Sequence, residues 1–403
     1  MVNFTQPSVE ILLLLSFTIV SLLLSFFYSY LIFSALREWK HLPQWNIPLD
    51  FNPKTSISIL IPARNEESNI TACLQSILHQ NYPPQLFEII VINDHSTDHT
   101  AEIVAQLQIL HLNIKLLQLA DFIKNESINA YKKKALEIGV AHAIGELIIT
   151  TDADCVAPPN WLQLLASLYE THQPKCIAAP VNFHQEKNLL ERFQSLDYAG
   201  TMVLTGAGIH ARTFRLSNGA NLAYPKAIFE EMQGFSGINQ LASGDDMMLV
   251  HKIAAKYPDG ITFLKNPDAT IFTTAKPTWR EFWQQRIRWA TKSAAYREWR
   301  ITFVVAMVFF LCCNILLSLL LIPFLPAGRQ GFGWQMAGIF IMQFVIKIIC
   351  DYYLLGTACH YFNKKDLMRS FLLAQILHTY YIIVIGILGN VIKKYEWKGR
   401  RVQ

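Results

Sequence analysis

The sequence predicts an α/β domain with a mixed, mostly parallel sheet, joined to apolar helices that span a membrane. Strand-like and helix-like segments alternate over residues 56–151, which is typical of parallel sheets with helical crossovers. Four apolar segments, one before this region and three after it, are each long enough to cross a bilayer. Polar residues follow three of the strands where each strand ends, and ligands bind at that edge of such sheets.

The composition agrees with a membrane protein that carries a polar domain. Of the 403 residues 52% are apolar, and the formal net charge is +5. This small charge does not argue for a nucleic-acid partner, and basic residues beside apolar runs are expected at an anionic membrane surface. The seven cysteines have neither metal-binding nor paired spacing, which fits a reducing compartment.

The first apolar segment lies between Glu10 and Arg37 and contains no charged residue. It lacks the basic start and the small-residue cleavage site of a signal peptide, so residues 1–41 are expected to be a retained membrane anchor. Basic residues such as Lys40 follow the segment, and none precedes it. The positive-inside rule then places the domain over residues 42–278 in the cytoplasm, on a multi-pass protein of the cell (inner) membrane.

The α/β region is predicted from apolar runs and turn signals. Strands are expected over residues 56–61, 87–92, 114–117 and 147–151, and helices over residues 67–79, 97–110 and 127–144. Pro62 closes the first strand, and residues 94–98 form the turn and cap before the second helix. Right-handed crossovers bring the ends of these strands to one edge of the sheet.

The fourth strand runs into Asp152-Ala153-Asp154. Two carboxylates at positions i and i+2 of a strand end lean to the same side of the pleat. Such a pair makes a hard-oxygen site for Mg²⁺ or Mn²⁺, which waters and substrate phosphates complete. Two acids in a turn are also often solvated or cap a helix, so the interpretation depends on the surrounding motifs.

The second half of the domain is less regular, but three motifs stand out. They are SNGANLAY at 217–224, SGDDMML at 243–249 and QQRIRW at 284–289. The last lies in an aromatic, basic stretch over residues 279–300, which suits a helix at the membrane interface. Residues 301–403 hold three further apolar segments and a short basic tail.

The late membrane segments leave the topology open. One anchor and three later spans place the C-terminus outside, yet the basic tail from Lys393 to Arg401 favours the inside. Either the tail is an exception or one late segment is re-entrant. Lys347 and Asp351 lie one helical turn apart and are expected to pair, although such groups can also mark a path for an acceptor.

With these motifs in order, the chain resembles the family 2 glycosyltransferases. It is most similar to the membrane-embedded branch that includes poly-N-acetylglucosamine, cellulose and hyaluronan synthases and ceramide glucosyltransferase. The resemblance covers residues 56–289 by motif and the rest by hydropathy. It implies a GT-A fold, a nucleotide-sugar donor of the UDP-sugar type, inversion to a β-linkage, and a Mg²⁺ or Mn²⁺ cofactor.

The resemblance also implies site residues. Four residues match positions that contact the nucleotide: Arg64, Glu66, Asp94 and Lys132. Asp94 matches the acid that bonds the uracil, although the residue before it is Asn93 where relatives carry a second Asp. Two further lysines after Lys132 leave that assignment open, since a run of lysines is often a solvated helix face.

Metal and sugar contacts are implied in the same way. Asp152 and Asp154 match the metal-binding pair, with Asp154 as the direct ligand. Asn218 and Asn221 match the segment that lines the sugar and acceptor pocket. As an alternative, the two asparagines are turn residues around Gly219.

Asp245-Asp246 lies where relatives carry Glu-Asp or Asp-Asp, and Gln285, Arg288 and Trp289 match the QxxRW signature. An inverting transfer needs one general base for the acceptor hydroxyl, and Asp246 is the expected base. Arg288 suits the diphosphate because guanidinium binds phosphate bidentately, and Trp289 suits an apolar acceptor wall. The alternatives are a helix N-cap for the acids and an interfacial anchor for Arg288 and Trp289.

The expected function is transfer of a sugar to a growing polysaccharide at the membrane. QxxRW followed by several spans favours this function, whereas the small size and the lack of a domain after the last span favour single addition to a membrane lipid. A non-catalytic scaffold that binds nucleotide-sugar is a remote alternative, because the metal acids, the base and Arg288 are all present. A transporter is weaker still, since the spans carry few ionisable groups.

Overall fold

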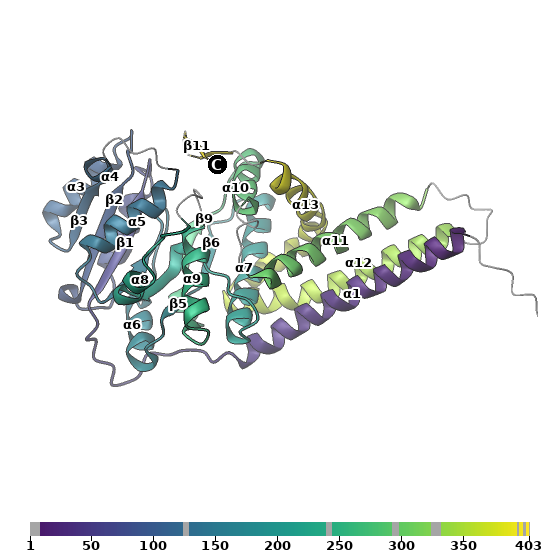
Figure 1. The fold of residues 1–403 in the computed structure, drawn as a ribbon, viewed down its shortest axis with the longest axis horizontal. Coiled ribbons are helices and arrows are strands. Elements are labelled where there is room, and N and C mark those ends of the chain that lie inside the picture. Colours follow the sequence, from purple (N-terminus) through teal and green to yellow (C-terminus); the bar gives the residue numbers. More distant parts are fainter. Residues whose placement is uncertain are drawn as a thin grey trace, which may run out of the picture.

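The computed structural model describes residues 9–123, 129–238, 244–291, 298–323, 332–392, 395–397 and 400–402. It consists of an α/β head and a projecting bundle of apolar helices (Figure 1). Parts of several predicted segments lie outside the described residues. These parts are the start of the 127–144 helix, Ser243, residues 292–297 of the interfacial stretch, residues 324–325 at the end of the first late apolar segment, and residues 393, 394, 398, 399 and 403 of the basic tail.

A seven-stranded sheet in the order β3-β2-β1-β4-β7-β5-β8 forms the centre of the head. Its strands are β1 (Ile57–Ala63), β2 (Phe87–Asn93), β3 (Ile114–Gln118), β4 (Leu147–Thr150), β5 (Cys176–Ala178), β7 (Leu222–Pro225) and β8 (Ile261–Phe263). The first four strands pair in parallel, and β7 runs antiparallel to both β4 and β5. The predicted mixed, mostly parallel sheet is therefore confirmed.

The central strands are mostly apolar because helices cover both faces of the sheet. Residues 59–61 of β1 and 89–92 of β2 are fully buried. The helices of the head are α2 (Ile70–Leu78), α3 (Thr100–Leu110), α4 (Leu119–Phe122), α5 (Tyr131–His142), α6 (Trp161–His172), α8 (Lys226–Glu231) and α9 (Asp245–Lys256). A Cβ on Gly145 would lie 2.4 Å from the Ser58 backbone nitrogen, so only glycine lets the chain enter β4 beside β1.

Helices α2 and α3 each begin three residues later than predicted, at Ile70 and Thr100. The polar residues before them are held by contacts between the two loops. The Glu66 backbone N–H donates to Thr100 Oγ1 at 2.7 Å, and the Glu67 N–H donates to Asp98 Oδ2 at 3.1 Å. Tertiary hydrogen bonds therefore replace the first helical turn that the sequence pattern predicted.

A second layer connects the head to the bundle. The short strands β6 (Val181–His184) and β9 (Ile271–Thr274) pair in parallel beside the long helix α7 (Leu189–His210). The predicted interfacial stretch contains helix α10 (Trp279–Ala290), which ends earlier than the predicted 279–300. The hairpin of β10 (Tyr395–Trp397) and β11 (Arg400–Val402) follows the last helix.

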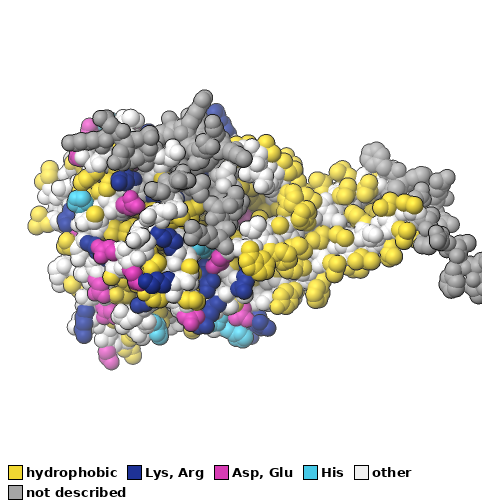
Figure 2. All heavy atoms as spheres, viewed as in Figure 1, with side chains coloured by type: hydrophobic (Ala, Val, Ile, Leu, Met, Phe, Trp, Pro, Cys, Tyr) yellow, Lys and Arg dark blue, Asp and Glu magenta, His cyan; other side chains and the backbone are white. Residues whose placement is uncertain are grey.

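Among the residues that the structure describes, four helices are long and apolar enough to cross a membrane. They are α1 (Val9–His41), α11 (Trp299–Leu321), α12 (Phe332–Tyr361) and α13 (Phe371–Val391). Hydrophobic side chains cover the visible face of the projecting bundle, while charged side chains gather on the head (Figure 2). The predicted anchor and the three later apolar segments are therefore present, and the chain is a candidate multi-pass membrane protein.

Helix α13 differs from the other three because both of its ends pack against the head (Figure 1). Before its start, Arg192 Nε of α7 donates to Ser370 Oγ at 2.8 Å. Near its end, a Cβ on Gly389 would lie 2.7 Å from Cβ of Ala290 in α10. A helix that leaves and rejoins the same layer fits the re-entrant alternative for one late segment.

The expected pair inside the bundle is present. Lys347 Nζ lies 2.6 Å from Asp351 Oδ2 and donates to Gln375 Oε1 at 2.7 Å. The Tyr28 hydroxyl donates to the other oxygen of Asp351. Lys347 is 1% exposed, so the pair is held away from solvent by the surrounding helices.

Replacement of one member of this pair is expected to destabilise the bundle. Lys347→Met leaves Asp351 buried without its cation, which typically costs about 3–5 kcal/mol. Thermal unfolding in one detergent measures the effect. The control is Arg37→Met, because Arg37 pairs with Glu38 on the surface and such pairs contribute about 0–1 kcal/mol. Equal shifts for the two variants would show that the buried pair is not important for stability.

Candidate active site

The ends of β1 and β2 lie side by side, since Ala63 pairs with Asn93 in the register. Arg64 follows β1, and its Nη1 donates to the backbone oxygens of Asp94 at 2.9 Å and His95 at 3.1 Å. Glu66 is held in the same loop and accepts from Asn69 Nδ2 at 2.8 Å. The predicted nucleotide-contacting turns therefore form one connected surface.

Asp94 is 3% exposed, and its Oδ1 lies 3.0 Å from Nδ1 of His95. The His95 ring meets the ring of Tyr131 edge to face, with centroids 5.9 Å apart. Sequence reasoning singled out neither ring. The available signal was their position, directly after Asp94 and directly before Lys132.

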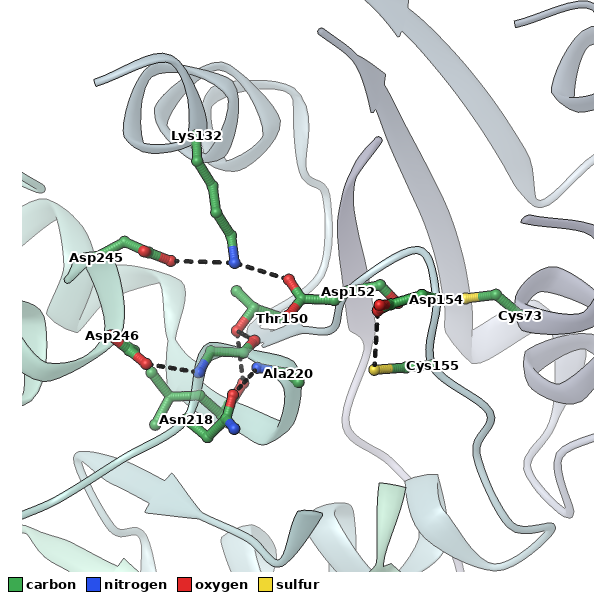
Figure 3. Close-up of polar contacts among 12 residues, drawn as sticks. Cys73, Lys132, Thr150, Asp152, Asp154, Cys155, Asn218, Ala220, Asp245 and Asp246 are labelled. Carbon is green, nitrogen blue, oxygen red and sulfur yellow. Dashed lines mark hydrogen bonds and ion pairs between the residues drawn. The ribbon is translucent and has the colours of Figure 1, made fainter. Parts of the chain in front are cut away.

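Lys132 is the centre of a charged cluster at the sheet edge (Figure 3). Its Nζ lies 2.7 Å from Asp152 Oδ1 and 3.6 Å from Asp245 Oδ2. Burial alone would lower the pKa of Lys132, but the charges of Asp152 and Asp245 raise it above its usual value. The side chain is therefore a stable cation between two carboxylates.

The structure separates Lys132 from the lysines beside it. Lys133 is 1% exposed and turns away from the cluster, where it donates to the Ile238 carbonyl at 2.6 Å. Lys134 is partly exposed on the same helix. The position that the family resemblance indicated is thus the one that reaches Asp152.

For the sugar transfer that the family resemblance implies, Lys132→Met is expected to reduce the rate by about ten- to hundredfold, because a charge-assisted contact contributes about 1.5–3 kcal/mol. The loss removes the cation that holds Asp152 and Asp245 together. Initial rates of nucleotide release measure the effect. The matched control is Lys134→Met on the same helix. Equal rates for both variants would contradict the assignment of Lys132 to the site.

Asp245 and Asp246 occupy the first turn of α9, and Gly244 rather than either acid takes the N-cap position with φ +82°. Asp246 Oδ2 accepts from the Gly219 backbone N–H at 3.0 Å, and Oδ1 accepts from the Met247 N–H at 2.8 Å. The simple N-cap alternative therefore does not describe these acids. Asp246 is half-buried and held against the Asn218-Gly219 turn.

The two predicted asparagines have different positions. Asn218 Oδ1 caps a short turn by accepting from the Ala220 N–H at 2.8 Å, and its amide bonds the hydroxyl of Tyr198. Asn221 is 0% exposed, and Trp161 Nε1 donates to it at 2.9 Å. The protein encloses the Asn221 side chain, as a turn residue requires, and its contact with a sugar stays a prediction.

Helix α10 brings the QxxRW residues to α7. The Trp289 ring lies 5.9 Å from the Tyr198 ring, and the Arg286 guanidinium lies 4.7 Å from the Trp289 ring. Arg286 Nη1 also pairs with Asp197 Oδ2 at 2.7 Å. Sequence reasoning missed Asp197, Tyr198 and Arg286, and nothing in their local sequence distinguishes them.

The other two residues of the QxxRW motif, Gln285 and Arg288, also lie on α10. Arg288 is half-buried on α10. Gln285 Oε1 is buried and has no hydrogen-bond partner among the described residues. Both lie on the helix that carries Trp289 to the site.

The predicted metal pair lies in a turn, not on a strand. Strand β4 ends at Thr150, so the pleat argument does not apply to Asp152 and Asp154. Asp152 turns to Lys132, whereas Asp154 Oδ1 lies 3.7 Å from the Cys155 sulfur (Figure 3). The described residues contain no group of three or more His, Cys, Asp or Glu suited to a metal.

The residues present nevertheless fit a divalent cation that is shared with a substrate. Asp152 and Asp154 are both half-exposed and offer hard carboxylate oxygens. Mg²⁺ usually takes one or two carboxylates and completes its shell with water and phosphate oxygens. Two acids at the carboxyl edge of the sheet are therefore enough protein ligands for such a cation.

Comparison with known proteins identifies the class of the domain. Residues 58–239 match the family model described as Glycosyl transferase family 2. Over these residues the chain is a family 2 glycosyltransferase domain, as its motifs predicted.

Two curated relatives extend the match beyond this region. The probable glycosyltransferase YdaM of Bacillus subtilis (strain 168) is 28% identical over 256 residues, which cover 62% of this chain and 58% of the relative. A poly-beta-1,6-N-acetyl-D-glucosamine synthase of Staphylococcus epidermidis is 26% identical over 240 residues, which cover 58% and 53%. The matches thus span little more than half the length of these relatives.

A solved structure confirms the fold. The mannosyltransferase PcManGT from Pyrobaculum calidifontis, solved in complex with GDP-Man and Mn²⁺, superposes with a TM-score of 0.55 at 18% identity. The superposition covers 94% of this chain and 98% of that chain. The chain therefore has the predicted GT-A fold with membrane-type helices.

Proposed function

We propose that the protein is an inverting glycosyltransferase that moves a sugar from a UDP-sugar donor to an acceptor at the membrane. The observation that carries this proposal is the convergence of Lys132, Asp152 and Asp246 from three separate elements at the carboxyl edge of the sheet. The catalytic domain spans residues 42–278, and residues 279–300 form the interfacial segment beside it.

The donor is bound along the edge formed by β1, β2 and β4. Arg64, Glu66 and Asp94 hold the nucleoside, with the rings of His95 and Tyr131 beside it. Asp154 and Asp152 hold Mg²⁺ or Mn²⁺, which would neutralise the charge of the diphosphate leaving group. The Mn²⁺ and nucleotide-sugar in the PcManGT structure support this assignment.

Asp246 is the general base. Its carboxylate is fixed by the Gly219 N–H and takes the proton of the acceptor hydroxyl. The acceptor oxygen forms the new bond to the anomeric carbon while the bond to the diphosphate breaks on the opposite face. Lys132 and Arg288 provide the positive charge that receives the departing diphosphate, and Asp245 holds Lys132 in place.

Two acceptors have specific support. A growing polysaccharide is supported by the similarity to the poly-beta-1,6-N-acetyl-D-glucosamine synthase. A membrane lipid is supported by a cavity of about 130 Å³ where the bundle meets α7.

The head lies in the cytoplasm in this proposal. Arg37 and Lys40 stand at the head end of α1, and residues 1–41 and 301–403 hold the membrane helices. If α13 is re-entrant, the three remaining spans return the chain to the side of the head, where the basic tail is expected. A proteolysis experiment on sealed vesicles with a C-terminal tag tests this topology.

The proposal is tested with purified protein in nanodiscs, a panel of UDP- and GDP-sugars, and Mg²⁺ or Mn²⁺. Metal-dependent UDP release with a growing polymer supports polysaccharide synthesis, and release with one sugar on an extracted lipid supports lipid glycosylation. No release from any nucleotide-sugar would contradict the proposed function.

A further inference from the structure

A cavity of about 130 Å³ lies where the membrane-type helices meet α7, and the donor site described above does not include it. Helices α1, α7, α11, α12 and α13 all contribute to its lining. A cavity of about 150 Å³ holds a molecule of the size of benzene. The cavity therefore accommodates a small polar group with a few carbons, not a whole lipid.

The polar end of the cavity contains an incomplete contact. Asp197 Oδ2 is paired with Arg286, but Asp197 Oδ1 lies 3.9 Å from His378 Nε2, which is too long for a hydrogen bond. His378 Nδ1 is buried and has no hydrogen-bond partner among the described residues. Both side chains line the cavity.

A hydroxyl group matches this arrangement better than an ion. It can donate to the carboxylate of Asp197 and accept from the ring of His378 in the tautomer with hydrogen on Nε2. A phosphate or carboxylate would meet the negative charge of Asp197 directly. A cationic head group would be repelled by Arg286 and Lys347, which lie close enough to His378 for their charges to act on it.

The other end of the cavity is apolar and reaches the surface of the bundle. Leu31 of α1 and Val304 and Val308 of α11 line it, and all three are partly exposed. These residues belong to helices that are long and apolar enough to span a membrane. An acyl or prenyl chain in the bilayer therefore has access to this wall.

A series of side-chain contacts connects the cavity to the donor site. Asp197 precedes Tyr198 on α7, and Tyr198 bonds Asn218 in the turn that holds Asp246. Arg286 binds Asp197 and also stacks on Trp289, the expected acceptor wall. A group bound in the cavity thus lies one layer of side chains away from the acceptor side of the site.

We propose that this cavity is the membrane-side entrance of the acceptor site and that it selects lipids with a free hydroxyl group. The inference rests on the proposed function and names the acceptor class for it. Asp197 and His378 recognise the hydroxyl, and the apolar wall holds the first carbons of the chain.

Two photoreactive probes test the selection in nanodiscs. One is a diazirine-bearing diacylglycerol with a free hydroxyl, and the other is the same lipid with that hydroxyl converted to a methyl ether. We expect the hydroxyl probe to label α7 or α13 about tenfold more than the ether, as the loss of a buried hydrogen-bonded contact implies. Equal labelling by the two probes, or labelling only of other helices, would overturn the proposal.

Three variants locate the site. Ala374→Leu fills the cavity and is expected to abolish labelling, whereas Leu373→Phe adds bulk on the exposed face of the same helix and is expected to preserve it. His378→Phe keeps a ring but removes the polar contact, so both probes are expected to label it equally. Overpacking in Ala374→Leu can destabilise the protein. If that variant does not fold, His378→Phe still tests the proposal. Selective labelling that survives in His378→Phe would contradict the assignment.

UDP release in the same nanodiscs separates this inference from the proposed function. Selective labelling without release from any nucleotide-sugar would retain the lipid site and contradict the glycosyltransferase activity. Release with transfer to a saccharide and no selective labelling would retain the activity and overturn the lipid site.

Discussion

Asp246→Asn is expected to reduce sugar transfer by about 10²- to 10⁴-fold, the usual contribution of a general base. Asparagine has the size of aspartate, and its side-chain oxygen can still accept from the Gly219 N–H that lies 3.0 Å from Asp246. It cannot take the proton of the acceptor hydroxyl. Because no phosphate contact is lost, donor binding is expected to remain largely intact.

Two measurements on the same preparation test this expectation: the rate of UDP release, and UDP affinity by calorimetry. Asp259→Asn is the matched control, since Asp259 is 68% exposed in its side chain and pairs with Arg212 on the surface. Most of the turnover remaining in Asp246→Asn would show that another group is the base. Loss of nucleotide affinity would instead indicate a role in donor binding.

Asp154→Ala is expected to weaken UDP binding in the presence of Mn²⁺ by about tenfold or more, because a metal ion on the diphosphate contributes several kcal/mol. Binding without metal is expected to change little. Titrations of UDP with and without Mn²⁺ give both affinities, and exposed Asp268→Ala is the control. Unchanged affinity with Mn²⁺ present would contradict the metal assignment.

The fold was predictable because the local sequence of each strand is enough to recognise it. Strands β1 and β2 are mostly apolar runs, and the polar residues that follow them mark the edge of the sheet. Helix starts were predicted less well. Loop residues such as Glu66 form hydrogen bonds with the neighbouring loop, so the helix begins later in the chain. Local helix propensity contains no information about this contact with another loop.

The site was predictable only where it consists of motif residues. Lys132, Asp152 and Asp246 were named in advance, and the structure brings them together. Asp197 and Arg286 could not be predicted, because they meet across 89 residues of chain and each lies inside a helix. For Asn221 the sequence left two roles open, because an asparagine that supports a turn and one that contacts a sugar look alike in sequence.

The pairing of Lys347 with Asp351 was predictable from helical spacing, whereas the placement of α13 was not. Hydropathy makes α13 a candidate span. Only the contacts of Ser370 with Arg192 and of Gly389 with Ala290 show that both ends of α13 pack against α7 and α10. If α13 is re-entrant, the number of membrane crossings counted from apolar segments is therefore too high by one.

Inverting sugar transfer with Asp246 as the base at the Lys132 cluster fixes the anomeric configuration of the product. Its most direct test is the NMR spectrum of the product that the wild-type protein forms from an α-linked UDP-sugar. We expect a β-linked product, visible as a large coupling of the anomeric proton in gluco-configured sugars. An α-linked product would contradict a single displacement with Asp246 as base.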